Sequence, residues 1–180
     1  YAERVLGVTD PSVAVLSVGD EDSKGNPLVK KVGAALRAYD GVRFIGNVEG
    51  QHIFAGEADV VVCEGFVGNV ILKAAEGLSE VFFKFMMEEL HSHMGAADAR
   101  VKEVIADFRR DTDYAHFGGA PLMGHRGSVF ICHGRSTARA MENAVRRAAE
   151  FVVHGVQEGI ADALDRLASN AEVQDILGQA

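Results

Sequence analysis

Hydrophobic residues follow two different spacings along the chain, and each change of spacing marks a strand that leads into a helix. The run Val60 to Val62 is continuous, as expected for a parallel strand buried on both faces. Gly65 and Gly68 follow it, and apolar residues then recur every three or four positions, as on an amphipathic helix. These apolar residues are Ile71, Ala74, Ala75, Leu78, Phe82, Phe85 and Met86. The pattern predicts a strand over residues 58–63, a glycine turn, and a helix from Asn69 to about Leu90.

The same order of strand and helix recurs along the chain. Further strands are predicted over residues 12–18, 42–48 and 127–133, and helices over 28–39, 51–56 and 137–154. Asn26 and Pro27 supply the N-cap and the first residue of one of these helices. The alternation predicts an α/β fold with a mostly parallel sheet flanked by helices. We expect one α/β domain over residues 1–180, with a helical hairpin inserted at about 78–110.

Three loops follow the carboxyl ends of predicted strands. They are Gly19 to Asn26, Glu64 to Asn69, and His133 to Ser136. In a parallel α/β sheet, ligands bind beyond the carboxyl ends of the strands. The three loops are therefore expected to line one crevice.

Lys24, Gly25 and Asn26 place a cation, a glycine and a helix cap in succession. The lysine charge and the helix dipole can hold the same oxyanion, although a solvated loop lysine gives the same pattern. In the next loop, Gly65 and Gly68 would let the backbone approach a ligand, and Asn69 would stand at the helix start. A purely structural turn is the alternative there.

His133, Gly134 and Ser136 lie between a predicted strand and a predicted helix. Backbone donors and an imidazole at this turn would add to an anion site. The alternative is a capping Ser136 beside a packed histidine. The three loops together favour a crevice that holds a small anion.

Other kinds of chemistry find little support in the sequence. Neither GxGxxG nor GxxxxGK[ST] occurs, there is no GxSxG nucleophile motif, and the histidines lack zinc-ligand spacing. Cys63 and Cys132 lie in apolar runs and are expected to be buried thiols. A formal net charge of −8 argues against general nucleic-acid binding. No apolar run of about 18 residues and no signal peptide is present, so the sequence indicates neither a spanning helix nor secretion.

The predicted long helix has a broad apolar face. The face around Phe82, Phe85 and Met86 fits core or dimer packing, or contact with a membrane surface.

The chain starts at Tyr1, and residues 3–7 resemble the tail of a helix. We therefore expect a fragment of a longer protein.

Four motifs together resemble the phosphate acyltransferases of bacterial phospholipid synthesis, in their C-terminal half. The motifs are Gly46-Asn-Val-Glu-Gly50, residues 58–73, Gly118-Gly-Ala-Pro-Leu122 and residues 133–140, in the order of the family. The resemblance implies an enzyme that converts acyl-[acyl carrier protein] and inorganic phosphate to acyl phosphate and free carrier protein. It also implies an isocitrate/isopropylmalate dehydrogenase-like fold.

The resemblance assigns catalysis to Lys24 and Asn69 and implies no metal and no cofactor. It further implies a homodimer, cytoplasmic and peripherally associated with the membrane through the helical hairpin. Its product would pass to the membrane glycerol-3-phosphate acyltransferase. Two alternatives remain open. One is a phosphotransacetylase or dehydrogenase relative on the same fold, and the other is a non-catalytic dimerisation and membrane-docking half.

Overall fold

The computed structural model of the chain has an α/β architecture and describes residues 1–94, 103, 105, 107, 118–125 and 127–178. These residues divide into two units, each treated on its own below. Unit 1 comprises Tyr1–Cys63, Leu122–Val129 and Ala149–Ala180, and unit 2 comprises Glu64–Pro121 and Phe130–Ala148. The prediction of one domain over the whole chain stays a prediction.

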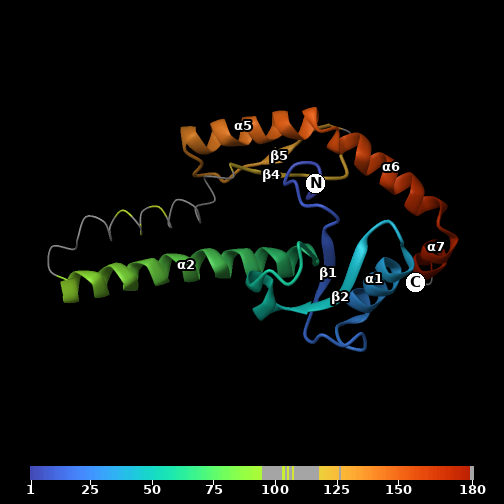
Figure 1. The fold of residues 1–180 in the computed structure, drawn as a ribbon, viewed down its shortest axis with the longest axis horizontal. Coiled ribbons are helices and arrows are strands. Elements are labelled where there is room, and N and C mark those ends of the chain that lie inside the picture. The colour runs from blue at the N-terminus through green and yellow to red at the C-terminus, as the bar shows by residue number, and fades with distance from the viewer. Residues whose placement is uncertain (95–102, 104, 106, 108–117, 126, 179–180) are drawn as a thin grey trace. The chain divides into compact units, whose positions relative to one another are not determined.

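Unit 1 is built on a three-stranded parallel sheet with the order β2-β1-β3 (Figure 1). β1 spans Ser12–Ser17, β2 Arg43–Glu49 and β3 Val60–Val62. β1 is central, and its apolar residues from Val13 to Leu16 are all buried. The continuous apolar run therefore forms the centre of the sheet, as a parallel strand covered on both faces requires.

Helices complete unit 1. α1 (Pro27–Ala38) connects β1 to β2 and contacts both strands, and α7 (Ala171–Gly178) packs on α1. The 3₁₀ helix η1 (Gly50–Ala55) joins β2 to β3, and α6 (Val156–Ser169) leads into α7. The strands expected over residues 12–18, 42–48 and 58–63, the first helix and the short helix at 51–56 are thus present, within a few residues of the predicted bounds.

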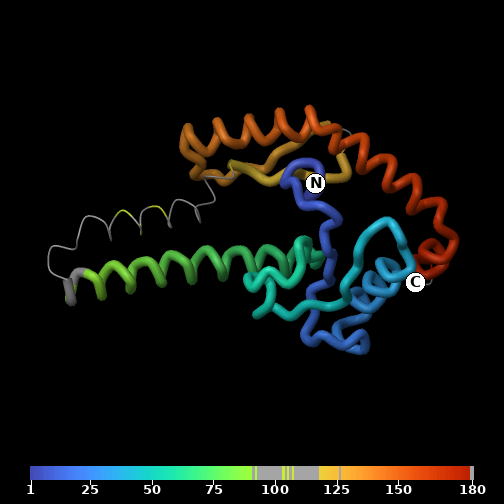
Figure 2. The backbone as a smooth tube through the Cα atoms, viewed as in Figure 1, coloured from blue at the N-terminus to red at the C-terminus, as the bar shows by residue number. Residues whose placement is uncertain are grey.

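The N-terminal turn of the chain is tied to the end of α5 (Ala138–Val153) within unit 1 (Figure 2). The Arg4 guanidinium donates to the carbonyl oxygens of His154 and Gly155. The rings of Tyr1 and Phe151 lie 6.3 Å apart between centroids. A cation at the C-terminal end of a helix complements both the unpaired carbonyls and the helix dipole, which explains this contact.

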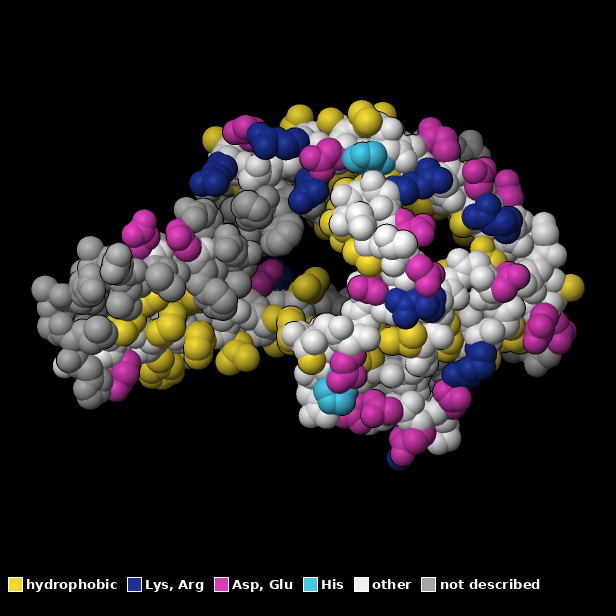
Figure 3. Space-filling view, in the orientation of Figure 1, with side chains coloured by type: hydrophobic (Ala, Val, Ile, Leu, Met, Phe, Trp, Pro, Cys, Tyr) yellow, Lys and Arg dark blue, Asp and Glu magenta, His cyan; other side chains and the backbone are white. Residues whose placement is uncertain are grey.

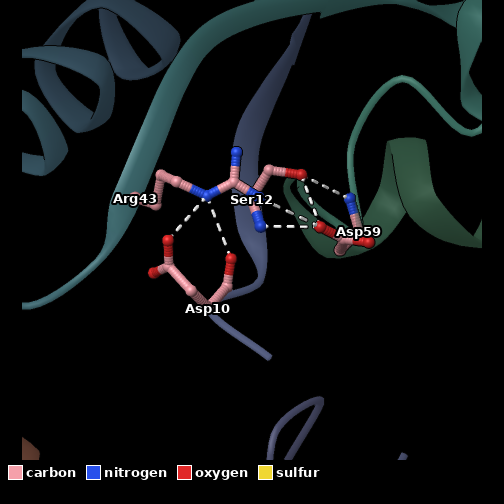
Figure 4. A network of polar contacts seen from close by, with 4 residues as sticks. All are labelled: Asp10, Ser12, Arg43 and Asp59. Atoms are coloured by element: carbon pink, nitrogen blue, oxygen red, sulfur yellow. Dashed lines mark hydrogen bonds and ion pairs between the residues drawn. The ribbon is translucent and has the colours of Figure 1, made fainter. Parts of the chain in front are cut away.

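A polar network fixes the amino ends of the strands in unit 1 (Figure 4). Asp59 accepts hydrogen bonds from both the backbone N–H and the hydroxyl of Ser12, each at 2.7 Å. Arg43 donates to the Asp10 carbonyl at 2.9 Å and lies 3.6 Å from the Asp59 carboxylate. The network therefore joins the segments that enter β1 and β3 to the first residue of β2.

Unit 2 contains α2 (Gly65–Met94), a two-stranded antiparallel sheet of β4 (Ala120–Pro121) and β5 (Phe130–Ile131), and most of α5. Gly118 lies against α5: a Cβ added to it would stand 2.3 Å from the backbone nitrogen of Ala144, and its φ is +80°. Only glycine fits this position, which accounts for the first glycine of the motif at residues 118–122.

The structure overturns three of our predictions. α2 begins at Gly65 rather than Asn69, so no glycine turn separates β3 from the helix. The strand predicted over residues 127–133 is the short β5, which pairs antiparallel with β4 instead of joining the parallel sheet. Cys63, which follows the edge strand β3, is exposed, and Cys132, which follows the short β5, is partly exposed, so neither is a buried thiol.

The predicted hairpin is only partly described. Its first arm is the end of α2, while its tip and most of the returning arm lie outside the described residues. Exposed apolar side chains gather along this part of α2 (Figure 3). Among the described residues, no helix has the length and apolar character needed to cross a membrane.

Candidate functional site

The Lys24 loop, residues 18–26, begins at the carboxyl end of the central strand β1 and ends at the N-terminus of α1. Its first half is held by three contacts. The Lys24 N–H donates to the Glu21 carbonyl at 2.9 Å, Asn47 of β2 donates to the same carbonyl at 2.9 Å, and Asp22 pairs with Arg37 of α1. The loop is thereby fixed to the sheet and to the helix that follows it.

The side chain of Lys24 is supported along its stem. A Cβ added to Gly19 would lie 2.8 Å from Lys24 Cγ, so the absence of a side chain there makes room for the lysine stem. Lys24 is exposed, and none of the described carboxylates lies within ion-pair distance of its ammonium. The loop therefore presents a positioned cation whose charge is available to a ligand.

The next two residues set the conformation of the loop. Gly25 has φ +89°, a left-handed conformation that favours glycine. Asn26 accepts a hydrogen bond from the Val29 N–H at 2.9 Å, which confirms its predicted role as the N-cap of α1. Because the Lys24 ammonium carries a positive charge and three donors, Lys24 is the group of this segment most suited to hold an anion.

The start of α2 in unit 2 differs from the predicted glycine turn. The carboxylate of Glu64 accepts hydrogen bonds from the Phe66 N–H at 3.0 Å and the Val67 N–H at 2.6 Å. The amide groups that were expected to hold an anion are thus occupied by the chain's own carboxylate. Asn69 is not a cap but an exposed residue within the helix, and the Gly68 N–H bonds to the Glu64 carbonyl.

The turn between β5 and α5 has a well-defined hydrogen-bond pattern. His133 Nδ1 accepts from the Arg135 N–H at 3.1 Å, and the Ser136 N–H donates to the His133 carbonyl at 2.9 Å. Thr137 accepts from the Ala140 N–H at 3.2 Å and so caps α5. The capping role considered for Ser136 is therefore wrong, and the Ser136 hydroxyl oxygen is buried without a hydrogen-bond partner among the described residues.

Charges of α2 and of this turn interact within unit 2. The hydrogen bond from Lys73, at 2.7 Å, is the largest influence holding the pKa of Glu76 below its ordinary value. Desolvation opposes this shift, while the charges of Lys73, His133 and Arg135 support it. The turn at His133 thus lies within electrostatic reach of the helix that carries Asn69.

The predicted site residues are distributed over both units. Lys24, Gly25 and Asn26 belong to unit 1, whereas Gly65, Gly68, Asn69, His133, Gly134 and Ser136 belong to unit 2. The convergence of all three loops on one crevice stays a prediction. Within the described part of the chain, no group of three or more His, Cys, Asp or Glu residues is arranged to hold a metal ion.

Three further residues shape these segments and were not recognised in the sequence. Glu64 and Thr137 cap helices, and Ser17 has a buried hydroxyl without a partner among the described residues. Thr137 stands directly before the helical spacing and was recognisable as a cap. The role of Ser17 depends on packing and has no local signal.

Comparisons with known proteins agree with the motifs. A model of the family described as fatty acid synthesis protein matches residues 1–159. The phosphate acyltransferase of Pelotomaculum thermopropionicum is 43% identical over 169 residues, which is 93% of this chain and 49% of that protein. For the phosphate acyltransferase of Thermodesulfovibrio yellowstonii the identity is 40% over 177 residues, 97% of this chain and 51% of the relative.

A third relative, the phosphate acyltransferase of Desulforamulus reducens, is 45% identical over 168 residues, covering 92% of this chain and 50% of its own length. The chain therefore spans about half the length of the curated relatives it matches. The family match extends over most of the chain and includes every predicted site residue. On this evidence, the chain belongs to the fatty acid synthesis protein family.

Proposed function

We propose that this chain supplies the phosphate-binding and acyl-transferring residues of a phosphate acyltransferase, which converts acyl-[acyl carrier protein] and inorganic phosphate to acyl phosphate and free carrier protein. The observation that carries the proposal is the Lys24 loop. It holds a lysine at the carboxyl end of the central strand, with its stem supported and its ammonium unpaired among the described residues. The relatives named phosphate acyltransferase support the choice of reaction.

Lys24 acts on phosphate. Its ammonium offsets part of the charge of the dianion and holds it beside the thioester, so that a bimolecular encounter becomes a reaction between positioned groups. The contacts of Glu21 and Asp22 fix the loop before substrate arrives, which lowers the ordering cost of binding. Gly25 and Asn26 place the lysine next to the N-terminus of α1, whose dipole also favours an anion.

Asn69 acts on the acyl group. A phosphate oxygen attacks the thioester carbonyl carbon, the new C–O bond forms, and the carbonyl oxygen becomes an oxyanion. When the carbonyl re-forms, the C–S bond breaks and the carrier-protein thiolate leaves. The Asn69 amide donates a hydrogen bond to the oxyanion, a contact that is stronger in the transition state than in the ground state. The thioester is already activated, so the reaction requires neither a covalent enzyme intermediate nor a metal.

The remaining site residues line the same crevice in this proposal. Gly65 and Gly68 allow a close approach to the start of α2, and His133, Gly134 and Ser136 contribute polar groups at the start of α5. The buried Ser136 hydroxyl, released from capping by Thr137, supports a ligand-binding role for this turn. A fold like that of isocitrate and isopropylmalate dehydrogenases completes the proposal.

The partners follow from the same proposal. Acylated carrier protein is the substrate, the chain acts within a homodimer, and the membrane glycerol-3-phosphate acyltransferase uses the product. Residues 78–110 contact the membrane surface as a helical hairpin. The exposure of Leu78, Phe82 and Phe85, at 71%, 58% and 66%, supports this contact, because more than half of each of these apolar residues faces solvent.

The test measures two quantities on the wild-type chain and on Lys24→Ala. The first is thiol release from a long-chain acyl-[acyl carrier protein], with and without inorganic phosphate. The second is the rise in thermal midpoint that phosphate produces, which reports binding without requiring turnover. We expect phosphate-dependent release and phosphate stabilisation in the wild type, and loss of both in Lys24→Ala.

Lys30→Ala is the matched control, because Lys30 is an exposed lysine on α1 and its loss changes the net charge equally. Equal phosphate stabilisation of the wild type and Lys24→Ala would contradict the proposed site. Phosphate stabilisation without thiol release would locate phosphate binding in this chain and would contradict its assignment to acyl transfer by itself.

A non-catalytic docking half is the second candidate, and the exposed apolar side chains of α2 favour it. This candidate predicts that the chain binds liposomes and forms dimers equally well with and without Lys24, and that phosphate stabilises neither form. Flotation with liposomes and sedimentation of the wild type and Lys24→Ala separate it from the enzymatic proposal. Loss of liposome binding in Phe82→Glu, with Lys84→Glu as a control on the same helix, would assign the contact to α2.

A further inference from the structure

Ser17 is the last residue of β1, the central strand, and stands two residues before Gly19 of the Lys24 loop. Its hydroxyl oxygen is buried and has no hydrogen-bond partner among the described residues. A buried hydroxyl without a partner is unfavourable, since it loses its hydrogen bonds to water and gains none from the protein. Its presence at this position therefore requires an explanation.

Within the described part of the chain, two other buried side-chain atoms lack a hydrogen-bond partner, His52 Nδ1 and Ser136 Oγ. His52 Nδ1 lies 3.3 Å from the Glu57 carboxylate, an ion-pair partner that accounts for it. Ser136 belongs to the turn already included in the proposed site. Ser17 is left as the hydroxyl that neither an ion pair nor the proposed site explains.

The surroundings of Ser17 connect it to Lys24. A Cβ added to Gly25 would stand 3.0 Å from Ser17 Oγ and 2.6 Å from Val29 Cγ1. The hydroxyl thus lies under the backbone of Gly25, the residue that follows Lys24. No side chain of residue 25 separates the two, so a small movement of the loop backbone brings a peptide group within hydrogen-bond distance of Ser17.

The contacts that fix the Lys24 loop to the sheet and to α1 are concentrated in its first half. Asn47 and Arg37 hold Glu21 and Asp22, in its first half, while in its second half the Asn26 cap bonds only to the following helix. Among the described residues, no hydrogen bond or ion pair ties Lys24 or Gly25 to the sheet, because the Lys24 N–H bonds within the loop. Ser17 is the sheet residue placed to supply the missing anchor.

We propose that Ser17 is a positioning residue of the Lys24 loop: its hydroxyl forms its hydrogen bond to the loop backbone at Gly25 when phosphate binds to Lys24. The inference rests on the proposed phosphate site. Binding of phosphate draws the loop onto the sheet, and the new bond holds the ammonium where the anion needs it. In the free chain the Ser17 hydroxyl is unpaired, which is unfavourable, and it gains its hydrogen bond only in the phosphate-bound state.

The test uses Ser17→Ala and inorganic phosphate as the probe. Without phosphate, we expect the thermal midpoint of Ser17→Ala to equal or exceed that of the wild type, because an unpaired buried hydroxyl has been removed. With phosphate, we expect affinity, measured from the dependence of the midpoint on phosphate concentration, to fall about tenfold. If thiol release is measurable, the KM for phosphate rises by a similar factor.

Two comparisons make the result specific. Ser169→Ala removes an exposed hydroxyl of the same unit that bonds to the Asp165 carbonyl, and it should leave phosphate affinity unchanged. Ser17→Cys keeps the size of the side chain with a weaker donor, and it serves if Ser17→Ala fails to fold. We expect it to bind phosphate more weakly than the wild type.

The possible outcomes separate the two proposals. Wild-type phosphate affinity in both Ser17 variants, with loss in Lys24→Ala, would overturn the role of Ser17 and leave the phosphate site intact. A lower midpoint of Ser17→Ala without phosphate would also overturn it, since the hydroxyl would then have a partner in the free chain. An absence of phosphate stabilisation in the wild type would overturn the phosphate site itself.

Discussion

The Lys24 loop of unit 1 and the start of α2 in unit 2 look alike in sequence, since each joins a strand to a helix through glycines and an asparagine. In the structure they differ in charge. The Lys24 loop uses Asn26 as the helix cap and leaves a lysine ammonium without a carboxylate partner among the described residues. The start of α2 places the Glu64 carboxylate on its own first amides.

In our proposal this difference separates phosphate binding from contact with the acyl group, two functions that the sequence pattern had placed in one crevice. A helix start that already binds a carboxylate has little attraction left for phosphate, because like charges in the same place repel. Our proposal therefore assigns the anion to Lys24. It assigns the uncharged acyl group to Asn69, which is exposed and lies one turn inside α2. The predictions below test this division, in order of decreasing effect.

The largest effect is expected for Asn69→Ala. If the amide stabilises the oxyanion, its loss slows turnover about 100-fold, or about 3 kcal/mol in activation free energy. Phosphate affinity and the thermal midpoint should change little, because Asn69 is exposed and the anion is held by Lys24. Steady-state thiol release at varied phosphate concentration measures both parameters. A large rise in the KM for phosphate with unchanged kcat would place phosphate, not the acyl group, at Asn69.

Replacement of a glycine should affect the two regions differently. Gly25→Ala forces a side chain to φ +89° and to within 2.9 Å of Val29 Cβ, so we expect a loss of about 1–3 kcal/mol in unfolding free energy, with weaker phosphate binding. Gly65→Ala meets no atom within 4 Å and stands in the first turn of α2, so it should be neutral or slightly stabilising. Denaturant unfolding of both variants measures the contrast, and equal effects would contradict it.

Glu64→Ala should cost about 1 kcal/mol in unfolding free energy, the usual effect of losing a helix cap. Phosphate affinity should remain that of the wild type, since the α2 start is not the phosphate site in this comparison. Glu64→Asp, which keeps the charge, is the control for stability. Clearly tighter phosphate binding in Glu64→Ala would show that the freed amides bind phosphate, and the division of functions would then fail.

The sequence predicted the elements whose signals are local. The central strand appears as a continuous apolar run. The start of α1 is predicted by Asn26 and Pro27, because a helix cap and a first-turn proline affect only the residues next to them. The start of α2 was misplaced because Asn69 is a good cap by residue type, whereas Glu64 caps through a longer side chain that has no strong sequence signal.

The remaining errors concern contacts between distant residues. The short β5 pairs with Ala120–Pro121, and nothing in its own sequence specifies that antiparallel partner. Cys63 is exposed because β3 lies at the edge of the sheet, and strand order is not encoded in the apolar run itself. The burial of the Ser17 hydroxyl likewise depends on a distant residue, Gly25, whose backbone lies close to it.

The smallest effect at neutral pH is expected at the opposite end of the same sheet. The hydrogen bond from the Ser12 hydroxyl is the largest cause that holds the pKa of Asp59 below its ordinary value of 3.8, with the Ser12 N–H and the Arg43 charge acting in the same direction and desolvation opposing them. A carboxylate with a lowered pKa stabilises the fold above its unfolded-state pKa, and this stability is lost as the pH falls through the folded-state pKa.

Asp59→Asn should therefore be less stable than the wild type near pH 7, and the difference should shrink as the pH falls below about 4. Thermal midpoints of both proteins between pH 7 and pH 3 measure this dependence. Phosphate affinity at pH 7 should be unchanged, because Asp59 lies at the amino ends of the strands while Ser17 and the Lys24 loop lie at the carboxyl end of β1. A change in phosphate affinity would mean that stability and anion binding are coupled along β1, and effects of the loop variants would then have to be measured at matched stability.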